Sequence, residues 1–169
     1  GIFNRQAAKE KSALNGRRDI EHDFGTNPCS EIILRPYQFC NLTEVVVRAT
    51  DSEKDLMKKV KLATILGTFQ SSLTDFKYIR KIWKSNTEEE RLLGVSLTGI
   101  MDSTVTNKPK DGFLNELKQS TIDTNKEFAK KLKIPQSTAI TCVKPSGTVS
   151  QLVDSASGCL LYTSPSPRD

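Results

Sequence analysis

The sequence of 169 residues predicts an α/β fold, and three observations support this prediction. β-Branched runs such as residues 45–47 are typical of buried strands. From Leu56 onwards, apolar residues recur at three- and four-residue steps, which indicates a long amphipathic helix. Candidate strands and helices then alternate along the chain, and this order is characteristic of α/β proteins.

The N-terminal part of the chain contains a weak helical pattern at residues 6–14. Residues 24–28 predict a turn, because Gly and Pro interrupt regular structure. Residues 31–34 predict a short strand that ends before Pro36. A second strand is expected within residues 41–50.

Three helices are expected in the middle of the chain. The first starts at residues 51–53, contains Gly67 as a mark of close packing, and carries one apolar stripe made of Leu56, Val60, Ala63, Leu66, Phe69, Leu73 and Phe76. The second starts at residues 87–90, a threonine followed by three glutamates, and runs through Leu92, Leu93 and Leu97 towards Met101. The third spans residues 112–132 and is closed by Pro135.

The C-terminal part predicts a strand at residues 137–143, a loop at 144–148 and a helix that starts at 149–154. The final stretch, residues 159–169, reads CLLYTSPSPRD, and its two prolines exclude helix and sheet. No apolar pattern continues into it from the preceding helix.

The composition is that of a soluble globular protein, with 36% hydrophobic and 27% charged residues. We expect no membrane span, because no apolar run approaches about 20 residues. Four cysteines without a secretion signal favour reduced thiols in the cytoplasm. No metal site is expected, because there is no CxxC pair and the single histidine, His22, has no ligand at metal-binding spacing.

The net charge is +5, and residues 51–84 carry eight Lys or Arg against four Asp or Glu. This surplus is read as a solvated helix face, with a patch that attracts phosphates as the alternative. Nucleic acid is not an expected partner, because no aromatic residues are interleaved with a basic block.

One stretch, NPCSE at residues 27–31, combines residue types that suggest chemistry. In an extended segment Asn27, Cys29 and Glu31 would point the same way. A carboxylate disfavours a neighbouring thiolate, so the stretch suits a thiol that stays neutral while glutamate acts as a base. A thiyl radical, which abstracts a hydrogen atom, meets that requirement. Cys40 follows eleven positions later, and two unrelated buried cysteines remain the alternative reading.

A second motif, KPSGTVS at residues 144–150, directly follows a predicted strand. A loop rich in Gly, Ser and Thr that opens a helix presents N–H groups and hydroxyls to phosphates. It is not a Walker loop, because the GxxxxGK[ST] spacing is absent. An ordinary strand–turn–helix connection remains the alternative reading.

Together these motifs resemble one family, the catalytic subunits of ribonucleotide reductases. Within it the chain is most similar to the adenosylcobalamin-dependent (class II) enzymes, and among these to the monomeric ribonucleoside-triphosphate reductases. The resemblance rests on residues 27–32, 39–45 and 144–150 and extends from Gly1 to about Gly158. Pro28 before the cysteine is typical of class II, whereas Ser30 stands where most members have glycine.

The resemblance implies a role for each residue of the two motifs. Cys29 would become the thiyl radical that takes the 3′ hydrogen of the ribose, Glu31 would remove the 3′-hydroxyl proton, and Asn27 would hold the sugar. Cys40 would be one of two reducing thiols. The substrate's phosphates would bind to Pro145, Ser146, Gly147, Thr148, Val149 and Ser150. Adenosylcobalamin would be the cofactor, and a thioredoxin-type dithiol the reductant.

The resemblance also implies an architecture. Residues 1–158 would form part of a ten-stranded α/β barrel with long helices, with the radical cysteine on a loop inside it. Cys142 would be a small core residue, since the family's partner for Cys40 lies on an earlier strand. Residues 159–169 would be a non-native tail that resembles translated sequencing-adapter sequence. The parent enzyme would be a monomer or homodimer, and the piece alone would be inactive.

Two other readings stay open. One is a class I ribonucleoside-diphosphate reductase large subunit, against which Pro28 and the short Cys29–Cys40 spacing argue. The other is a non-catalytic basic module that binds phosphate or nucleic acid. Under that reading, Asn27, Cys29 and Glu31 need not face the loop at residues 145–150.

Overall fold

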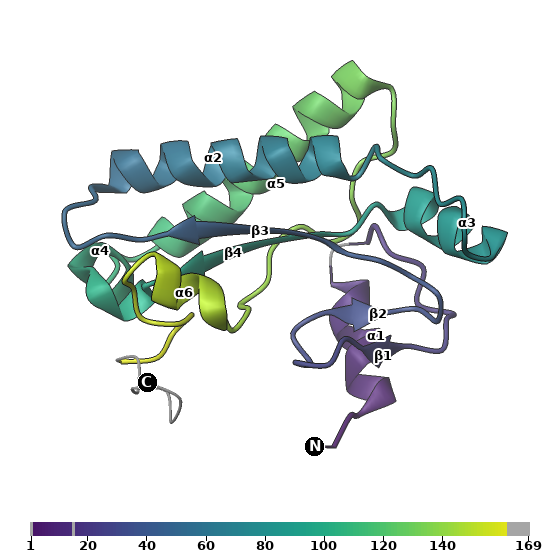
Figure 1. Cartoon of the computed structure of the whole chain (residues 1–169), viewed down its shortest axis with the longest axis horizontal. Coiled ribbons are helices and arrows are strands. Elements are labelled where there is room, and N and C mark those ends of the chain that lie inside the picture. The colour runs from purple at the N-terminus through teal and green to yellow at the C-terminus, as the bar shows by residue number, and fades with distance from the viewer. Residues whose placement is uncertain (1, 15, 162–169) are drawn as a thin grey trace.

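The computed structural model describes residues 2–14 and 16–161 of the chain (Figure 1). In chain order, their helices and strands are α1 (Arg5–Ala13), β1 (Gly25–Thr26), β2 (Ile33–Leu34), β3 (Asn41–Val46), α2 (Glu53–Gln70), α3 (Lys81–Glu90), β4 (Leu93–Thr98), the 3₁₀ helix η1 (Ile100–Asp102), α4 (Thr104–Asn107), α5 (Phe113–Leu132) and α6 (Thr148–Leu152). The predicted α/β character is therefore confirmed. No helix in this part of the chain is long and apolar enough to cross a membrane.

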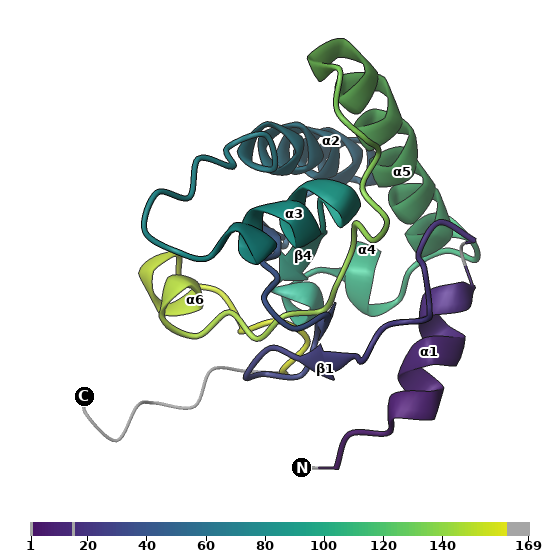
Figure 2. The ribbon, with the colours of Figure 1, turned by 90° about the vertical axis from the view of Figure 1, so that its right-hand side faces the viewer.

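The centre of the fold is the parallel pair of β3 and β4, in which Asn41 lies opposite Leu93 and Val46 lies opposite Thr98. Parallel strands need a long crossover, and α2 and α3 supply it. Helices α2 and α5 pack together and cover one face of the pair. The hairpin β1–β2 and α6 lie on the other side (Figures 1 and 2).

A single apolar core lies between the helical layer and the strands. Its buried members come from β3, β4, both long helices and the segment after α5, and they are Val45, Val47, Leu56, Val60, Ala63, Leu93, Val95, Phe113, Leu117 and Ile140. Burial of such side chains from separate parts of the sequence is the main favourable term in folding.

The apolar stripe predicted for α2 is correct only in its first half. Leu56 is fully buried as predicted, but Leu66 and Leu73 are 64% and 73% exposed. The helix ends at Gln70, and its buried side continues instead with the small residues Thr64, Gly67, Thr68 and Ser71. These small residues allow α2 to approach its neighbouring elements closely.

Gly67 illustrates that approach. A Cβ built on Gly67 would lie 3.5 Å from side-chain atoms of both Leu93 and Thr43. The close packing predicted from this glycine is therefore confirmed, and it brings α2 directly onto the strand pair.

The helix predicted from residues 87–90 to Met101 is wrong. These acids end α3 rather than begin a helix, because Arg91 adopts a left-handed conformation with φ 45°. The apolar residues that follow form β4. Nearly every residue of β4 is buried, Ser96 and Thr98 included, and a strand buried on both faces lacks the apolar–polar alternation that would distinguish it from a helix.

The strand predicted at residues 137–143 is an extended segment beside β4 rather than a full strand. Thr141 forms a parallel bridge with Val95. The Val95 N–H donates to the Ile140 carbonyl at 2.8 Å, but the Leu93 N–H donates to the Ala139 carbonyl at 3.0 Å. The two N–H donors are two residues apart, but the carbonyl groups that accept from them belong to adjacent residues. The regular hydrogen-bond spacing of a parallel ladder is therefore broken here.

The remaining predicted elements agree with the structure to within about two residues, except that the strand within residues 41–50 ends at Val46. These are the helices at residues 6–14, 112–132 and 149–154 and the strands at residues 31–34 and 41–50, which correspond to α1, α5, α6, β2 and β3. The turn predicted at residues 24–28 also contains the two-residue strand β1.

A buried ion-pair cluster joins the N-terminal segment to the end of α3. The Glu90 side chain is 1% exposed, and its two oxygens accept hydrogen bonds from Arg18 at 2.7 and 2.9 Å. Arg35 lies 3.2 Å from the same carboxylate, and the Gln38 amide donates to it. A buried charge is tolerated only when it is paired and hydrogen-bonded in this way.

A second buried polar group, the Asn125 side chain on α5, joins three parts of the chain. Its amide nitrogen donates to Thr68 Oγ1 on α2 and to Ser137 Oγ, each at 3.0 Å. Its amide oxygen accepts from the Ser137 N–H at 3.0 Å. Asn125 is fully buried, so these bonds fix where the segment after α5 returns to the sheet.

Replacement of Asn125 by alanine is expected to lower the free energy of unfolding by about 1–3 kcal/mol, because buried donors and acceptors would lose their partners. Urea denaturation followed by circular dichroism measures the change. Asn115→Ala, at an exposed position of the same helix, is the control and is expected to change stability by less than about 0.5 kcal/mol. Equal effects of the two substitutions would contradict this role of Asn125.

Candidate active site

The first motif forms the loop of a β-hairpin. Strands β1 and β2 pair antiparallel, with Thr26 opposite Ile33, and residues 27–32 join them. Asn27 shapes the loop: its Oδ1 accepts from the Ile32 N–H at 3.0 Å, and its carbonyl accepts from the Ser30 N–H at 3.0 Å. Ser30 adopts a left-handed conformation with φ 64°, which costs a non-glycine residue about 1 kcal/mol.

The prediction of an extended segment at residues 27–31 is therefore wrong, although two of its side chains do meet. Because the chain turns at Ser30, side chains two residues apart no longer point the same way. Asn27, Cys29 and Glu31 are therefore not aligned on one surface. The hairpin itself brings the Asn27 amide to the Glu31 carboxylate, with Nδ2 donating to Oε1 at 2.6 Å. Cys29 lies between them in the loop and is exposed.

The second motif reaches the same carboxylate. Lys144 Nζ lies 2.7 Å from Glu31 Oε1, although the two residues are 113 positions apart. The Glu31 side chain is 5% exposed and that of Lys144 is 29% exposed. The other oxygen, Glu31 Oε2, is buried and has no hydrogen-bond partner among the described residues.

This pairing favours the ionised form of both groups. Burial raises the pKa of Glu31, but hydrogen bonds from Lys144, from its own backbone N–H and from Asn27 outweigh burial and leave the pKa below its usual value. The pKa of Lys144 is raised, chiefly by its hydrogen bond to Glu31 and against the effect of burial. Glu31 is thus more readily ionised than an ordinary glutamate.

Two thiols lie next to this ion pair. A Cβ built on Gly94 of β4 would lie 3.1 Å from the sulfur of Cys142 and 3.4 Å from the sulfur of Cys40, so both thiols flank the same glycine. Burial raises the pKa of Cys40 to about 12, and the nearby Cys142 and Glu31 add to this effect. Burial likewise raises the pKa of Cys142 to about 11, with Glu31 adding to it. Both thiols therefore stay protonated at neutral pH.

The loop predicted to bind phosphate follows Lys144 directly. The Lys144 N–H donates to Ser96 Oγ at 3.0 Å, which anchors the start of the loop on β4. Ser146 Oγ donates to Glu44 of β3. Residues 147–149 are exposed, whereas Ser150 is buried and its hydroxyl donates to the Gly147 carbonyl at 2.9 Å. Ser150 therefore shapes the turn.

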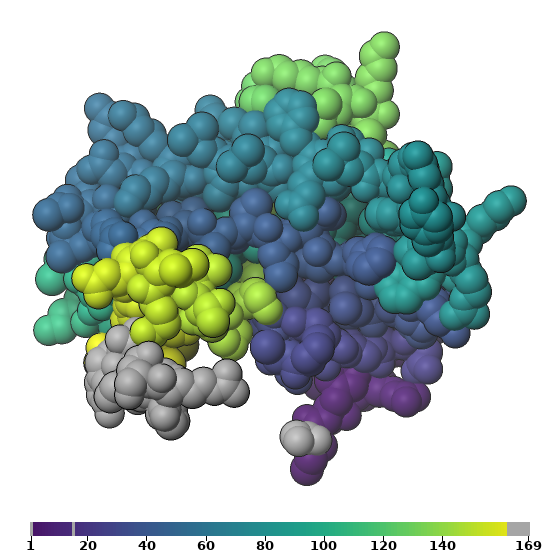
Figure 3. Space-filling model, viewed as in Figure 1, coloured from purple at the N-terminus to yellow at the C-terminus, as the bar shows by residue number. Residues whose placement is uncertain are grey.

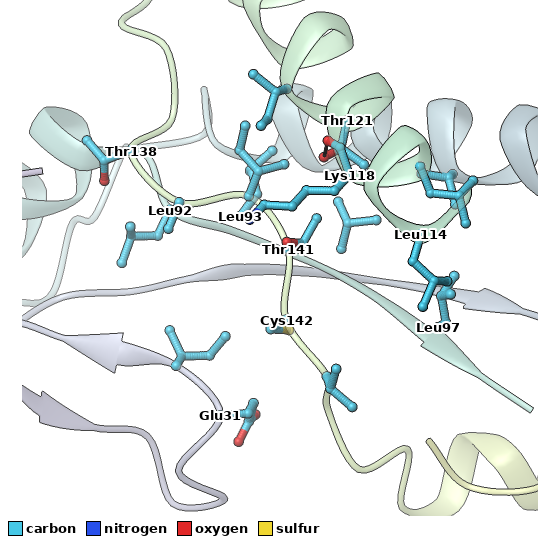
Figure 4. A pocket seen from close by; sticks show the side chains of 18 of the residues that line it. Glu31, Leu92, Leu93, Leu97, Leu114, Lys118, Thr121, Thr138, Thr141 and Cys142 are labelled. Atoms are coloured by element: carbon cyan, nitrogen blue, oxygen red, sulfur yellow. Dashed lines mark hydrogen bonds between the residues drawn. The ribbon is translucent and has the colours of Figure 1, made fainter. Parts of the chain in front are cut away.

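A cleft of about 580 Å³ opens beside these groups (Figure 4). Figure 4 shows Glu31 and Cys142 at one end and the apolar side chains of Leu92, Leu93 and Leu114 further along, beneath α5. Cys29, Cys40 and the loop at residues 145–150 do not line this cleft. The space-filling view shows that α6 and the hairpin segment form neighbouring parts of the side opposite α2 (Figure 3).

The structure thus brings Asn27, Glu31 and Cys40 together and sets the start of the phosphate loop beside them. Two members of this cluster were missed by the sequence analysis. Lys144 lay in the quoted motif without an assigned role, and Cys142 was read as an ordinary core residue although it is half-buried beside Glu31. No group of three or more potential metal ligands occurs in the described residues.

Comparisons with known proteins agree with the motifs. No protein-family model matches the chain. The chain is 33% identical over 165 residues to an adenosylcobalamin-dependent ribonucleoside-triphosphate reductase of Lactobacillus gasseri, an alignment that covers 79% of this chain and 21% of the relative. It is 31% identical over 139 residues to a probable enzyme of the same name from Dictyostelium discoideum, covering 80% of this chain and 18% of the relative.

A crystal structure of a B12-dependent (class II) ribonucleotide reductase is similar in fold, with a TM-score of 0.65 and 26% identity. The superposition covers 79% of this chain and 22% of that one. The chain therefore spans about a fifth of the length of the proteins it matches. The predicted resemblance is confirmed: over this segment the chain is homologous to the adenosylcobalamin-dependent (class II) ribonucleotide reductases.

Proposed function

We propose that this chain is part of an enzyme that reduces ribonucleoside triphosphates to 2′-deoxyribonucleoside triphosphates by a thiyl radical mechanism. The observation that carries the proposal is the contact between the two motifs, in which Lys144 bonds Glu31 at 2.7 Å. It brings the loop predicted to bind phosphates next to the hairpin that carries Cys29. The homologues' names point to the same substrates and cofactor.

The proposed reaction uses the described residues in separate roles. A thiyl radical on Cys29 takes the hydrogen atom from C3′ of the ribose, and Glu31 accepts the 3′-hydroxyl proton. The 2′-hydroxyl then leaves as water. Two thiols, one of them Cys40, supply two electrons and two protons and become a disulfide, so that one ribonucleotide yields one deoxyribonucleotide and one water. Cys29 finally returns its hydrogen atom.

The electrostatics support this division of roles. A base must be ionised, and the Lys144 contact favours the Glu31 carboxylate. The unpartnered Oε2 of Glu31 is the oxygen with capacity to accept a substrate hydroxyl. A hydrogen-atom donor must stay protonated, and burial keeps Cys40 in that form. Asn27 would bond the sugar with its remaining amide hydrogen.

Adenosylcobalamin is the proposed cofactor, and the chemistry it would supply is generation of the radical on Cys29. Cys29 fits this chemistry, because its thiol is exposed on the hairpin loop and can be reached by a group held outside this segment. A thioredoxin-type dithiol would reduce the disulfide of Cys40. Monomer or homodimer assembly and a cytoplasmic location are part of the same proposal.

We further propose that residues 1–158 belong to a ten-stranded barrel and that residues 159–169 do not. Packing supports a boundary at Gly158, whose N–H donates to Thr98 Oγ1 at 2.8 Å. The next residues are exposed, Leu160 at 57% and Leu161 at 72%. Residues 162–169 of the predicted tail lie outside the described residues.

The alternative of a non-catalytic basic module is not favoured by the geometry. A hairpin that faced away from the loop at residues 145–150 would have supported this alternative. In the structure, Glu31 instead contacts Lys144, the residue directly before that loop. Basic side chains in residues 51–84 are partly paired, as Lys59 is with Asp51 at 2.6 Å. The homologues' names favour class II over the class I alternative.

The radical assignment is tested in the longer reading frame that carries this segment, recovered by sequencing across the Gly158 junction. Reduction of CTP with adenosylcobalamin and a dithiol is expected, and Cys29→Ala is expected to abolish it, since no other group would take the 3′ hydrogen. Cys40→Ser is expected to stop multiple turnover. The measurement is product per enzyme by chromatography, with CDP run in parallel.

Ser72→Ala, two residues beyond the end of α2, serves as the control and is expected to keep full activity. Product formed without adenosylcobalamin, or product that survives Cys29→Ala, would overturn the mechanism. Preference for CDP over CTP would instead overturn only the triphosphate assignment.

The phosphate loop is tested by Ser146→Ala in the same enzyme. The Ser146 hydroxyl donates to Glu44 in the chain without substrate and would turn to a substrate phosphate. Loss of that bond is expected to raise the KM for CTP about ten- to a hundredfold, with little change in kcat. Steady-state kinetics measure both constants, and Ser72→Ala again provides the matched serine control. An unchanged KM would show that this hydroxyl does not contact the substrate.

A further inference from the structure

Lys144 is fixed in place from both sides along its backbone. Its N–H donates to Ser96 Oγ at 3.0 Å. Its carbonyl lies so close to Gly158 that a Cβ at that glycine would be 3.1 Å from the carbonyl oxygen. The side chain then extends to the hairpin, where Nζ reaches Glu31 Oε1. A lysine whose backbone is held in this way directs its ammonium group towards Glu31 Oε1.

The two oxygens of Glu31 have different surroundings. Oε1 accepts from Lys144 Nζ at 2.7 Å and from Asn27 Nδ2 at 2.6 Å. Oε2 is buried and unpartnered among the described residues, in a side chain that is 5% exposed. A buried acceptor without a donor is costly, so Oε2 keeps the capacity to accept a hydrogen bond from a group that binds beside it.

We propose that Lys144 is a positioning residue for Glu31: its ammonium group holds Oε1 and balances the carboxylate charge, so that Oε2 is the oxygen left to accept a substrate hydroxyl. The inference rests on the proposed function for the identity of that hydroxyl, the ribose 3′-hydroxyl. Because Lys144 directly precedes the loop at residues 145–150, it would also set the distance between that base and the substrate's phosphates.

The charged and titratable groups around Glu31 show why a cation is needed. Cys40, directly before β3, and Cys142, on the extended segment beside β4, both lie near Glu31, and both thiols are neutral. Arg18, which also lines the cleft, is bound to Glu90. Lys144 is therefore the cation that directly contacts Glu31 within the described residues. Without it, burial would favour the protonated acid, which cannot act as a base.

The inference is tested on the chain itself by measuring the pKa of Glu31 with carboxyl-carbon NMR. In the unaltered chain the pKa is expected below its ordinary value of about 4.3. In Lys144→Met it is expected above that value, because burial acts unopposed, and Lys144→Arg is expected to restore a low value. Lys118→Met, which removes an exposed lysine that lines the same cleft, is the control and should leave the pKa of Glu31 unchanged.

The same pKa in Lys144→Met and in the unaltered chain would overturn the inference. If Lys144→Met fails to fold, Lys144→Gln replaces it, since its amide can donate to Oε1 without a charge. A raised pKa in Lys144→Gln supports the role of the charge, and an unchanged pKa contradicts it. Thermal unfolding of each variant establishes that the titrated protein is folded.

An activity arm separates this inference from the proposed function. In the longer reductase, Lys144→Met is expected to move the acidic limb of the pH–rate profile to higher pH, so that kcat falls on the acidic side of the profile, with rescue by Lys144→Arg. A shifted pKa without any change in that profile would leave Lys144 in its positioning role and overturn Glu31 as the base. The NMR result decides the inference even if the enzyme shows no reductase activity.

Discussion

The buried carboxylate of Glu90 is the interaction on which the arrangement of the candidate site depends. Its burial would cost several kcal/mol if it were unpaired, and Arg18, Arg35 and Gln38 satisfy it together. Arg18 precedes the hairpin in the sequence, and Arg35 and Gln38 follow it. The Glu90 cluster therefore holds both ends of the hairpin segment against the end of α3, and removal of one partner would cost about 3–5 kcal/mol.

Once the hairpin is held there, the strand pair determines what it meets. Gly94 has no side chain, which leaves room for the sulfur atoms of Cys40 and Cys142 on the same side of β4. The segment that carries Cys142 continues to Lys144, whose ammonium group closes the contact with Glu31. Residues from three distant parts of the sequence thus meet because the sheet, the Glu90 cluster and the Glu31–Lys144 pair restrict the positions of the segments that carry them.

Local sequence signals correctly predicted the helices whose ends are determined by residues at those ends. The Ser52 and Asp55 capping box starts α2, and Gly112 directly precedes α5. The helix predicted through Leu92 and Leu93 failed because that apolar run is a strand buried on both faces. The exposure of Leu66 could not be predicted either, since the buried side of α2 is chosen by Gly67 and by the contact to Asn125, which are tertiary effects.

The candidate site was predicted in its residue types but not in its geometry. Asn27 and Glu31 were expected to meet through strand alternation, whereas a left-handed Ser30 brings them together through a turn. The role of Lys144 could not be derived from spacing, because its partner lies 113 residues away. A lone lysine before a glycine-containing loop has many possible uses, and only the fold selects one.

The most direct test of this account is a double-mutant cycle between Glu31 and Lys144, because it measures whether the two motifs meet. The free energy of unfolding is determined by urea for the unaltered chain, Glu31→Gln, Lys144→Met and the double variant. The account predicts a favourable coupling of about 1–3 kcal/mol at pH 7. The folded-state pKa of Glu31 is lowered, so the coupling should persist above its ordinary pKa and disappear as the pH falls through the folded value. A coupling of zero at pH 7 would contradict the convergence of the two motifs.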